Sequence, residues 1–344
     1  MAFEFGSRRE ARSGLLSTIS KARIARACRI ALNDLTIAFE HRVLGKRYLE
    51  RRVNDYRLAL DATDRGISRR LWRYGTREPE QKFLLERVLR PGMRVFDVGA
   101  NIGYYTVMMA RLVGPQGRIY AVEPHPDNYR LLCHNVSRNA VDNVETENVA
   151  IDVRAGKREL FVSDRCNWHS FHDPRITAGE VWTEVYRRHM PTTTSVETRS
   201  LAGYLETKPQ LDLVRMDLEG FEVEILDALA ELPRSQTRTL RVLFETHPEF
   251  YHPVQHDMRR VLRRLHERHG YRASYIVSDF FDGSRGSAYT EPGRDVFARY
   301  GYGLSHVLDP SHGRPIFVGV RMEDAIDLIC TSENVHAVVL EPGG

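Results

Sequence analysis

Cysteine is scarce in this 344-residue sequence, which contains only Cys28, Cys133, Cys166 and Cys330. These four are widely scattered, and no two of them have the CxxC spacing of a zinc site or a redox dithiol. The sequence also lacks an apolar run long enough to cross a membrane, and it has no signal-peptide core near its N-terminus. We therefore predict a cytoplasmic protein in a reducing compartment.

A strong excess of one charge is missing as well. The 50 lysines and arginines are nearly balanced by 46 aspartates and glutamates, which leaves a formal net charge of +4. A balance this even does not predict a nucleic-acid partner. The small excess lies at the front of the chain, where basic residues precede almost every acidic one: Arg8, Arg9, Arg12, Lys21, Arg23, Arg26 and Arg29.

Residues 1–46 are predicted to form a basic helical N-terminal extension, because apolar residues recur at helical spacing among the arginines. Two interpretations of this helix stay open. It packs on the body of the protein or on a second subunit, as in a homodimer, or residues 8–45 make a peripheral contact with an anionic membrane surface. The first is favoured, since the apolar residues are small and no tryptophan anchors the stripe.

The remainder predicts an α/β fold without internal repeats or low-complexity tracts. Residues 47–90 indicate a hairpin, with its turn at Asn54-Asp55, and helices leading into the core. Residues 91–325 alternate strand and helix, and residues 326–344 are interpreted as a C-terminal tail. The alternation implies right-handed crossovers and a mostly parallel central sheet with helices on both faces. Strands are expected at 94–98, 118–122, 144–150, 212–216, 240–245, 272–277 and 314–320, and helices at 102–113, 127–139, 222–229 and 254–269.

An insert at residues 155–210 interrupts the alternation. It combines two predicted strands, at 157–163 and 193–198, with a polar loop that contains Trp168, His169, His172, Trp182 and Tyr186. A long loop inside an α/β domain tends to form a lid or a substrate wall. We therefore expect the insert on the acceptor side of a site.

The segment from Val95 to Gly103 carries the strongest functional signal. A strand containing Asp97 runs into a loop with Gly99, Asn101 and Gly103, and a helix follows. Glycines let the backbone turn tightly and approach a ligand closely, and the start of the helix offers N–H groups to an anion. The carboxylate of an amino-acid ligand fits that position, and Asp97 can accept from its ammonium group.

The ends of the next two strands add polar groups at the same edge of the sheet. Glu123 ends the second strand, where an acidic side chain can accept both hydroxyls of a ribose. Asn148, at the end of the third, is expected to border an adenine ring. A ligand with an amino acid, a ribose and an adenine is S-adenosylmethionine.

A nicotinamide dinucleotide is the weakest alternative. The glycines have G-x-x-x-G spacing rather than G-x-G-x-x-G, and Asp97 precedes the first of them by two residues. Both features disfavour a pyrophosphate. A helix-capping turn without a ligand is disfavoured too, because glycines and acids coincide at both strand ends.

Four stretches together resemble the FkbM-type S-adenosylmethionine-dependent methyltransferases. They are Tyr74-Gly75-Thr76-Arg77-Glu78-Pro79, the Val95–Gly103 loop, Ala121-Val122-Glu123-Pro124-His125-Pro126 and Met216-Asp217-Leu218-Glu219-Gly220-Phe221-Glu222. The resemblance covers roughly residues 55–320. It implies a Rossmann-like class I methyltransferase fold, with residues 91–325 as the cofactor-binding domain, and methylation of a hydroxyl on a small molecule, sugar or lipid.

The resemblance also assigns residues. It implies that Asp97, Gly99, Asn101, Gly103 and Glu123 bind the cofactor. Glu78 would lie near its methionine end, and Asp217 and Glu219 would face the transferring methyl group. One position departs from the family pattern, since Arg215 stands where a lysine is common, and an arginine cannot serve as a base.

A hydroxyl acceptor needs a base within hydrogen-bond reach. Asp217 closes a strand at the cofactor edge and is the favoured candidate for that role or for holding a divalent cation. His247 follows another strand and has the ordinary pKa of a general base. Glu219 either acts in catalysis or complements a helix dipole, and Glu222 is interpreted as a solvated or salt-bridged helix residue. Glu245 and His247, with Asp217, offer ligands for a metal, but nothing fixes their separation and no metal site is predicted.

Three function classes remain. The first is an O-methyltransferase for a small-molecule, glycan or lipid acceptor. The second is an RNA methyltransferase that binds phosphates through the basic N-terminal arm; the sequence shows no base-amine motif and no basic stripe interleaved with aromatics, so nucleic acid is disfavoured. The third is a non-catalytic binding protein that retains the fold, against which the intact glycine and acid positions argue.

Overall fold

The computed structural model describes residues 24–173, 189, 192–252, 254–278, 293–308, 314–331 and 335–343. The chain divides into two compact units between Arg77 and Glu78. This division falls inside the segment 47–90 that the sequence analysis treated as one piece. Of the residues named above, Trp182 and Tyr186 of the insert and the basic residues from Arg8 to Arg23 lie outside the described ranges.

The first unit contains the expected N-terminal helix and hairpin. Residues 24–42 are helical, and β1 (Tyr48–Val53) pairs antiparallel with β2 (Tyr56–Asp61). The helix α2 (Ile67–Tyr74) follows. Asp64, two residues before the cap Gly66, stabilises the start of this helix, because its Oδ2 accepts from the Ser68 N–H at 2.7 Å.

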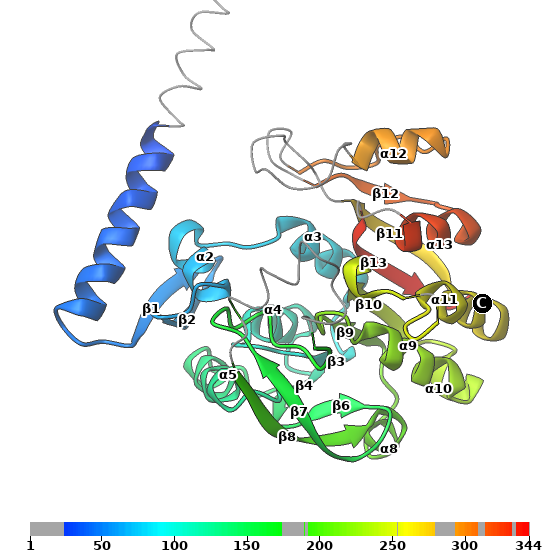
Figure 1. Ribbon diagram of the computed structural model, residues 1–344, viewed down its shortest axis with the longest axis horizontal. Helices are drawn as coiled ribbons and strands as arrows, with labels where there is room; N and C mark the ends of the chain where they lie inside the picture. Colours follow the sequence, from blue (N-terminus) through cyan, green and yellow to red (C-terminus); the bar gives the residue numbers. More distant parts are fainter. Residues whose placement is uncertain are drawn as a thin grey trace, which may run out of the picture. The chain divides into compact units, whose positions relative to one another are not determined.

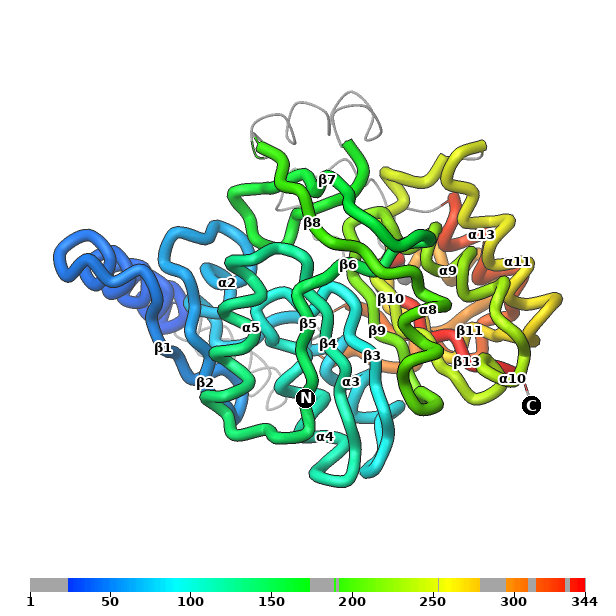
Figure 2. Tube along the Cα trace, turned by 90° about the horizontal axis from the view of Figure 1, so that it is seen from below, coloured from blue at the N-terminus to red at the C-terminus, as the bar shows by residue number. Residues whose placement is uncertain are grey.

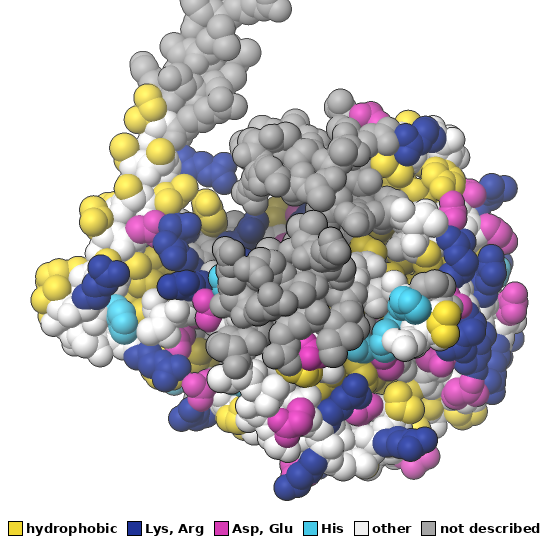
Figure 3. All heavy atoms as spheres, in the orientation of Figure 1, with side chains coloured by type: hydrophobic (Ala, Val, Ile, Leu, Met, Phe, Trp, Pro, Cys, Tyr) yellow, Lys and Arg dark blue, Asp and Glu magenta, His cyan; other side chains and the backbone are white. Residues whose placement is uncertain are grey.

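The described part of the N-terminal helix is more apolar on its surface than the sequence analysis assumed. Large side chains that are more than half exposed follow one another along it, namely Ile24, Leu32, Leu35 and Phe39, and the exposed Val43 and Leu44 come directly after its end. Figure 3 shows these apolar side chains along the helix in yellow. The prediction of a helix is confirmed for residues 24–42. The helix contacts α2 of the same unit, since Trp72 Nε1 donates to the Asn33 carbonyl at 2.7 Å and Arg73 Nη2 lies 2.6 Å from Asp34 Oδ2. A second subunit or a membrane surface as a further partner stays a prediction.

The second unit is built on an eight-stranded sheet with the order β12-β11-β13-β10-β9-β3-β4-β5 (Figure 1). Its parallel strands, β3, β4, β5, β9 and β10, were all predicted, and their bounds are Arg94–Val98, Arg118–Val122, Val144–Glu147, Leu213–Met216 and Arg241–Glu245. From β3 the chain continues to β4 and β5 on one side, whereas β9 and β10 lie on the other. The strand order therefore reverses between β3 and β9, where α/β folds bind their ligands.

The other half of the sheet is antiparallel. Strand β13 (Val335–Glu341) lies between β10 and β11 (Arg272–Ser278) and pairs antiparallel with both, and β12 (Ile316–Val318) forms the edge. The interpretation of residues 326–344 as a tail was wrong, because they contain the end of α13 (Met322–Thr331) and this interior strand. Its run of Val338, Val339 and Leu340 is fully buried, as an interior strand requires.

Helices cover both faces of the sheet, as predicted. One face forms the main hydrophobic core with α8 (Leu201–Glu206), α9 (Glu222–Glu231), α11 (Met258–His269) and α13. The helices α4 (Tyr104–Val113) and α5 (Pro126–Arg138) pack against β3, β4 and β5. Alternate strand residues such as Phe96, Val214 and Phe244 belong to the main core, so their neighbours Asp97, Arg215 and Glu245 project to the opposite face.

The remaining helices are short. Pro79 begins α3 (Pro79–Val88), as expected for a proline in the first turn. The sequence analysis missed α8, α10 (Arg234–Thr237), α12 (Gly293–Arg299) and α13, and a 3₁₀ turn covers Pro248–Phe250. The helix α11 begins at Met258, later than predicted, because the Asp257 side chain accepts from the Arg260 N–H and caps it there.

A separate three-stranded sheet contains both predicted strands of the insert. Its order is β6-β8-β7, with β6 at Ala150–Asp152, β7 at Gly156–Val162 and β8 at Thr192–Ser200. Figure 2 shows the three strands together beside α8. The third strand was predicted as one piece, 144–150. It is divided between β5 of the large sheet and β6 of the small one, so Asn148 lies between two sheets.

Candidate active site

The loop between β3 and α4 has the geometry that the glycine pattern predicts. Gly99 and Gly103 have φ of 77° and 87°, and Asn101 between them has φ of 52°. A Cβ on Gly99 would lie 2.6 Å from the carbonyl oxygen of Asp217, and one on Gly103 would lie 2.9 Å from the Leu132 side chain. Glycine is therefore required at both positions, and Gly99 places this loop directly against the end of β9.

Glu123 binds the glycine-rich loop from the end of β4. Its Oε2 accepts from the Asn101 N–H at 2.8 Å and its Oε1 from the His125 N–H at 2.9 Å. Burial raises the pKa of this carboxyl to about 7, although the two backbone hydrogen bonds act in the opposite direction. A carboxylate accepts more than one hydrogen bond per oxygen, so Glu123 keeps acceptor capacity for two hydroxyls.

Asn148 has a different part in this turn from the one predicted. Its Nδ2 donates to the carbonyl oxygens of Glu123 and Pro124, at 2.8 and 3.0 Å. The amide thereby fixes the backbone that follows β4 and positions Glu123. Contact with an adenine ring stays a prediction.

Arg215 joins three acidic side chains beneath the loop. Its Nη1 lies 3.6 Å from Asp97 Oδ1, and its Nη2 lies 3.3 Å from Asp217 Oδ2 and 3.7 Å from Glu245 Oε1. The guanidinium also lies over the Tyr105 ring, 4.3 Å from its centroid. Burial lowers the pKa of Arg215, but the three carboxylates outweigh it and the net shift is upward. Arg215, which stands where lysine is common in the family, therefore stays positively charged.

Asp97 is completely buried in this arrangement. Its Oδ2 accepts from Thr106 Oγ1 at 2.6 Å, and its Oδ1 has no hydrogen-bond partner within the described ranges. Burial raises the pKa of Asp97, against the opposing effects of Arg215 and Thr106. Apart from the ion pair with Arg215, Oδ1 keeps the capacity to accept a hydrogen bond, and its contact with an ammonium group stays a prediction.

The predicted catalytic residues Asp217, Glu219 and His247 do come together. His247 Nε2 lies 3.9 Å from Asp217 Oδ1 and 3.6 Å from Glu219 Oε2. Asp217 Oδ1 is a buried atom without a hydrogen-bond partner among the residues that the structure describes. Burial raises the pKa of Glu219 well above its usual range; His247 opposes this effect and Asp217 adds to it. The three side chains can therefore share protons.

Glu222, which the sequence analysis interpreted as a solvated or salt-bridged helix residue, organises this group. It is fully buried and pairs with His247, so of the two alternatives the structure shows the salt bridge. Its Oε1 accepts from the Leu218 N–H at 2.7 Å and lies 3.0 Å from His247 Nδ1, and its Oε2 accepts from the Gly220 N–H at 3.1 Å. Burial alone would lower the pKa of His247, but Glu222 and Glu219 raise it well above its ordinary value.

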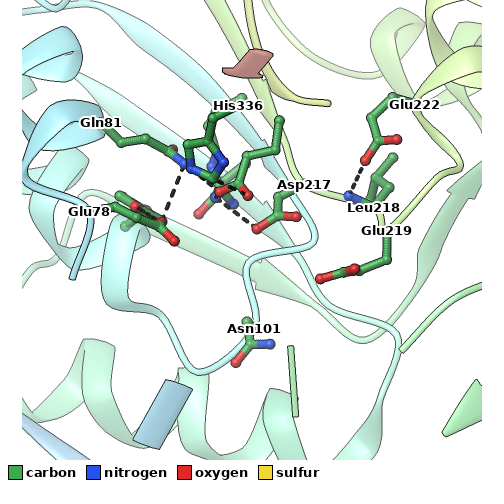
Figure 4. Close-up of polar contacts among 12 residues, drawn as sticks. Glu78, Gln81, Asn101, Asp217, Leu218, Glu219, Glu222 and His336 are labelled. Atoms are coloured by element: carbon green, nitrogen blue, oxygen red, sulfur yellow. Dashed lines mark hydrogen bonds and ion pairs between the residues drawn. The ribbon is translucent and has the colours of Figure 1, made fainter. Parts of the chain in front are cut away.

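Glu78 lies on the other side of Asp217, with Gln81 and His336 (Figure 4). Its Oε2 accepts from the Tyr105 hydroxyl at 2.5 Å and from Gln81 Nε2 at 3.3 Å. Gln81 in turn donates to Glu245, which ends β10. Sequence reasoning missed Gln81 and His336. The figure also shows Glu219 and Glu222 on the far side of Asp217, and Asn101 on the glycine-rich loop.

The insert contacts the glycine-rich loop, α5 and the turn that carries Glu219, and its role on the acceptor side stays a prediction. Asn101 Nδ2 and Asn128 Nδ2 both donate to the Cys166 carbonyl, at 2.7 and 3.0 Å. Ser170 Oγ donates to the Glu219 carbonyl at 2.8 Å. His169 accepts from the Ser163 N–H, and burial lowers its pKa to about 3, so its ring is neutral.

These observations fit an S-adenosylmethionine molecule at the reversal between β3 and β9. Gly99 lets the loop pack closely against the end of β9, and Asp97 and Asp217 each carry a buried oxygen without a hydrogen-bond partner in the described part of the chain. The cofactor would be held by Asp97, Gly99, Asn101, Gly103 and Glu123.

Among the described residues, no helix is both long and apolar enough to cross a lipid bilayer.

The fold and this site define the class, a Rossmann-like methyltransferase that uses S-adenosylmethionine. The family follows from direct comparison. The Methyltransferase FkbM domain matches residues 97–273, so the chain belongs to the FkbM methyltransferase family.

Relatives agree with this assignment. The 31-O-demethyl-FK506 methyltransferase FkbM of Streptomyces tacrolimicus is 26% identical over 201 residues, which are 56% of this chain and 67% of that protein. Protein-L-isoaspartate O-methyltransferase 1 of Arabidopsis thaliana is 36% identical over 89 residues, 26% of this chain and 35% of that protein. The matches to four such isoaspartate enzymes span between 26% and 35% of their length.

Two solved structures are among those that are similar to the chain. M. jannaschii TYW2 in complex with AdoMet is 14% identical, with a TM-score of 0.37 over 87% of this chain and 88% of that one. The precorrin-6y C5,15-methyltransferase of Geobacter metallireducens is 13% identical, with a TM-score of 0.34 over 76% of this chain and 86% of that one.

Proposed function

We propose that the protein transfers the methyl group of S-adenosylmethionine to a hydroxyl oxygen of a small molecule, sugar or lipid. The observation that carries the proposal is the Oδ1 of Asp217, a buried oxygen without a hydrogen-bond partner among the described residues. Asp217 follows β9, its main-chain carbonyl lies against Gly99, and its Oδ1 lies 3.9 Å from His247 Nε2. A hydroxyl is a poor nucleophile while protonated, so a carboxylate here supplies what that acceptor requires.

The residues then divide their roles. Asp217 takes the proton of the acceptor hydroxyl. His247, whose pKa Glu222 and Glu219 raise, keeps its proton at neutral pH and so acts as a positioning residue rather than a base. Arg215 holds Asp97 and Asp217 in place. The bound cofactor supplies an activated methyl group, and the chain contributes orientation and exclusion of water.

The relative that covers most of the chain supports an oxygen acceptor. The name of the Streptomyces tacrolimicus protein describes a methyltransferase acting at an oxygen of a demethylated small molecule. The isoaspartate enzymes are named as O-methyltransferases of protein. The first match covers 56% of this chain and the second 26%, so we favour the small-molecule hydroxyl over a carboxyl acceptor.

Binding is tested first by calorimetric titration with S-adenosylmethionine and, separately, with NAD. We expect binding of the first alone and its loss in Glu123→Ala, with Glu86→Ala, at a half-exposed helix ion pair, as the matched control. Binding of NAD, or of neither ligand, would contradict the proposal.

The acceptor class is tested with methyl-labelled S-adenosylmethionine and four acceptor pools: phenols and polyols, lipid-linked sugars, isoaspartyl peptide and tRNA. Transfer to a hydroxyl gives an ether that survives alkali, whereas transfer to a carboxyl gives an ester that alkali cleaves. We expect alkali-stable label in one of the first two pools, reduced about 100-fold in Asp217→Asn with cofactor affinity retained. Label confined to the peptide or the tRNA would overturn the proposal.

A further inference from the structure

A second group of metal-ligating side chains lies outside the candidate active site. His172 comes from the insert after β7, Glu224 from the first turn of α9, and His256 from the segment just before α11. Their ligand atoms all lie within 4.8 Å of one another. Three segments that are distant in the sequence thus present two imidazoles and one carboxylate at a single point.

The distances match the requirements of a small cation. Glu224 Oε1 lies 2.7 Å from His256 Nδ1 and 3.6 Å from His172 Nε2, and the two imidazole centroids are 4.3 Å apart. Tetrahedral zinc has bonds of about 2.0–2.2 Å to nitrogen and oxygen, which places neighbouring ligand atoms about 3.3 Å apart. The observed separations lie on both sides of that value.

The polar atoms of this group lack other partners. Only 6% of His172 is exposed, and its Nε2 has no hydrogen-bond partner among the described residues. The same holds there for Glu224 Oε2, whereas His256 Nδ1 contacts only Glu224 Oε1 of this same group, at 2.7 Å. Buried polar atoms are nearly always satisfied, so the two unsatisfied atoms beside this imidazole–carboxylate contact indicate a missing positive partner.

The orientation of His172 is fixed by packing. Its ring lies against Phe221 and Phe250, with centroids 5.6 and 6.1 Å away, and its backbone N–H donates to Ser170 Oγ at 3.1 Å. Since Ser170 also donates to the Glu219 carbonyl, the segment that carries His172 is attached to the turn of the candidate active site. An imidazole held in this way is preorganised for a ligand.

We propose that His172, Glu224 and His256 bind a divalent transition metal of the zinc class, with water completing the coordination. Two imidazoles favour such an ion over magnesium or calcium, which prefer oxygen ligands. The metal links the insert to α9 and to the start of α11, and so holds the wall of the acceptor side in place. The proposal does not depend on the reaction that the protein catalyses.

The test is a titration of chelator-treated full-length protein with Zn²⁺ and with Co²⁺, followed by calorimetry and by the visible absorption of Co²⁺. We expect one ion per chain with micromolar or tighter affinity. Both Glu224→Gln and His256→Ala should weaken binding at least about 100-fold. Thermal unfolding of wild type should shift upward with Zn²⁺, and that of the two variants should not.

Two further variants identify the site. His252→Ala removes a neighbouring exposed histidine and should leave the affinity unchanged. Asp217→Asn removes a ligand from the group Asp217, Glu222 and His247, whose ligand atoms are equally close together, and it should also leave the affinity unchanged. No binding to folded wild type, binding that survives in both Glu224→Gln and His256→Ala, or binding lost in Asp217→Asn would overturn the proposal.

Discussion

Arg215 and Asp97 occupy paired positions of the neighbouring strands β9 and β3, and the guanidinium Nη1 lies 3.6 Å from the carboxylate Oδ1. Because the two strands are parallel, their side chains project to the same face of the sheet at the same level. The pair is buried, with 3% of Arg215 and none of Asp97 exposed. The register of β3 and β9 therefore places a cation beside the acidic side chains Asp97, Asp217 and Glu245 of the candidate site.

Removing that cation should destabilise the protein severely. Arg215→Met leaves three carboxylates without a counter-charge in a buried site, and we expect the free energy of unfolding to fall by about 3–5 kcal/mol. Arg241→Met breaks a surface pair with Glu341, at 2.9 Å, and should cost no more than about 1 kcal/mol. Denaturant unfolding of both variants measures the difference. Equal losses would show that the buried network contributes nothing beyond a surface ion pair.

The cofactor loop should not tolerate a side chain at its first glycine. In Gly99→Ala the new Cβ meets the Asp217 carbonyl, and φ is 77°. We expect a loss of about 2–3 kcal/mol in stability, together with weaker binding of S-adenosylmethionine. Gly92→Ala is the matched control, since Gly92 has φ of 87° and a Cβ there meets nothing within 4 Å. The control should cost about 1 kcal/mol and bind the cofactor normally; the same result for Gly99→Ala would contradict the assigned contact.

Cofactor affinity should rise with pH across neutrality. Burial raises the pKa of Glu123 to about 7, and ribose hydroxyls donate to the ionised form. We expect the Kd for S-adenosylmethionine to be about tenfold weaker at pH 6 than at pH 8, because the ionised fraction falls by about that factor. Calorimetry of Glu123→Gln, which cannot ionise, should give weak binding without this dependence. A wild-type Kd that does not change with pH would show that ionised Glu123 does not bind the cofactor.

His247 should stabilise the protein more in acid than in alkali. Glu222 and Glu219 raise the folded pKa of His247 above its unfolded value near 6.5, so its contribution is complete below that pH. It is lost as the pH rises through the higher folded pKa. The stability difference between wild type and His247→Gln should therefore shrink from pH 6 toward alkaline pH, measured by denaturant unfolding at each pH. A difference that stays constant over this pH range would refute the ion pair with Glu222.

The cofactor half of the fold could be predicted from the sequence because its signals are local. The strands β3 and β4, the helix α4 and the bends at Gly99 and Gly103 each follow from residues a few positions apart. The grouping of the acidic residues at the strand ends could be predicted as well, because parallel strands bring their carboxyl ends to the same edge of the sheet.

The missed features depend on distant partners. Glu222 has the sequence of an ordinary first-turn acid, yet the turn Leu218–Gly220 folds back and buries it against His247. His172 lies in an irregular loop where only the tertiary structure brings it to Glu224. Strand β13 was missed because its partners β10 and β11 precede it by long stretches of chain.

The place of β13 has a consequence for biosynthesis. A ribosome releases β10 and β11 long before residues 335–341, yet in the finished sheet these two strands do not touch each other. Until β13 emerges, each strand has an edge with unpaired backbone groups, and such an edge can pair with a strand of another chain. The cofactor half needs only residues up to β10 for its parallel strands and can assemble earlier. Synthesis thus builds the two halves of the enzyme at different times, and the second half closes last.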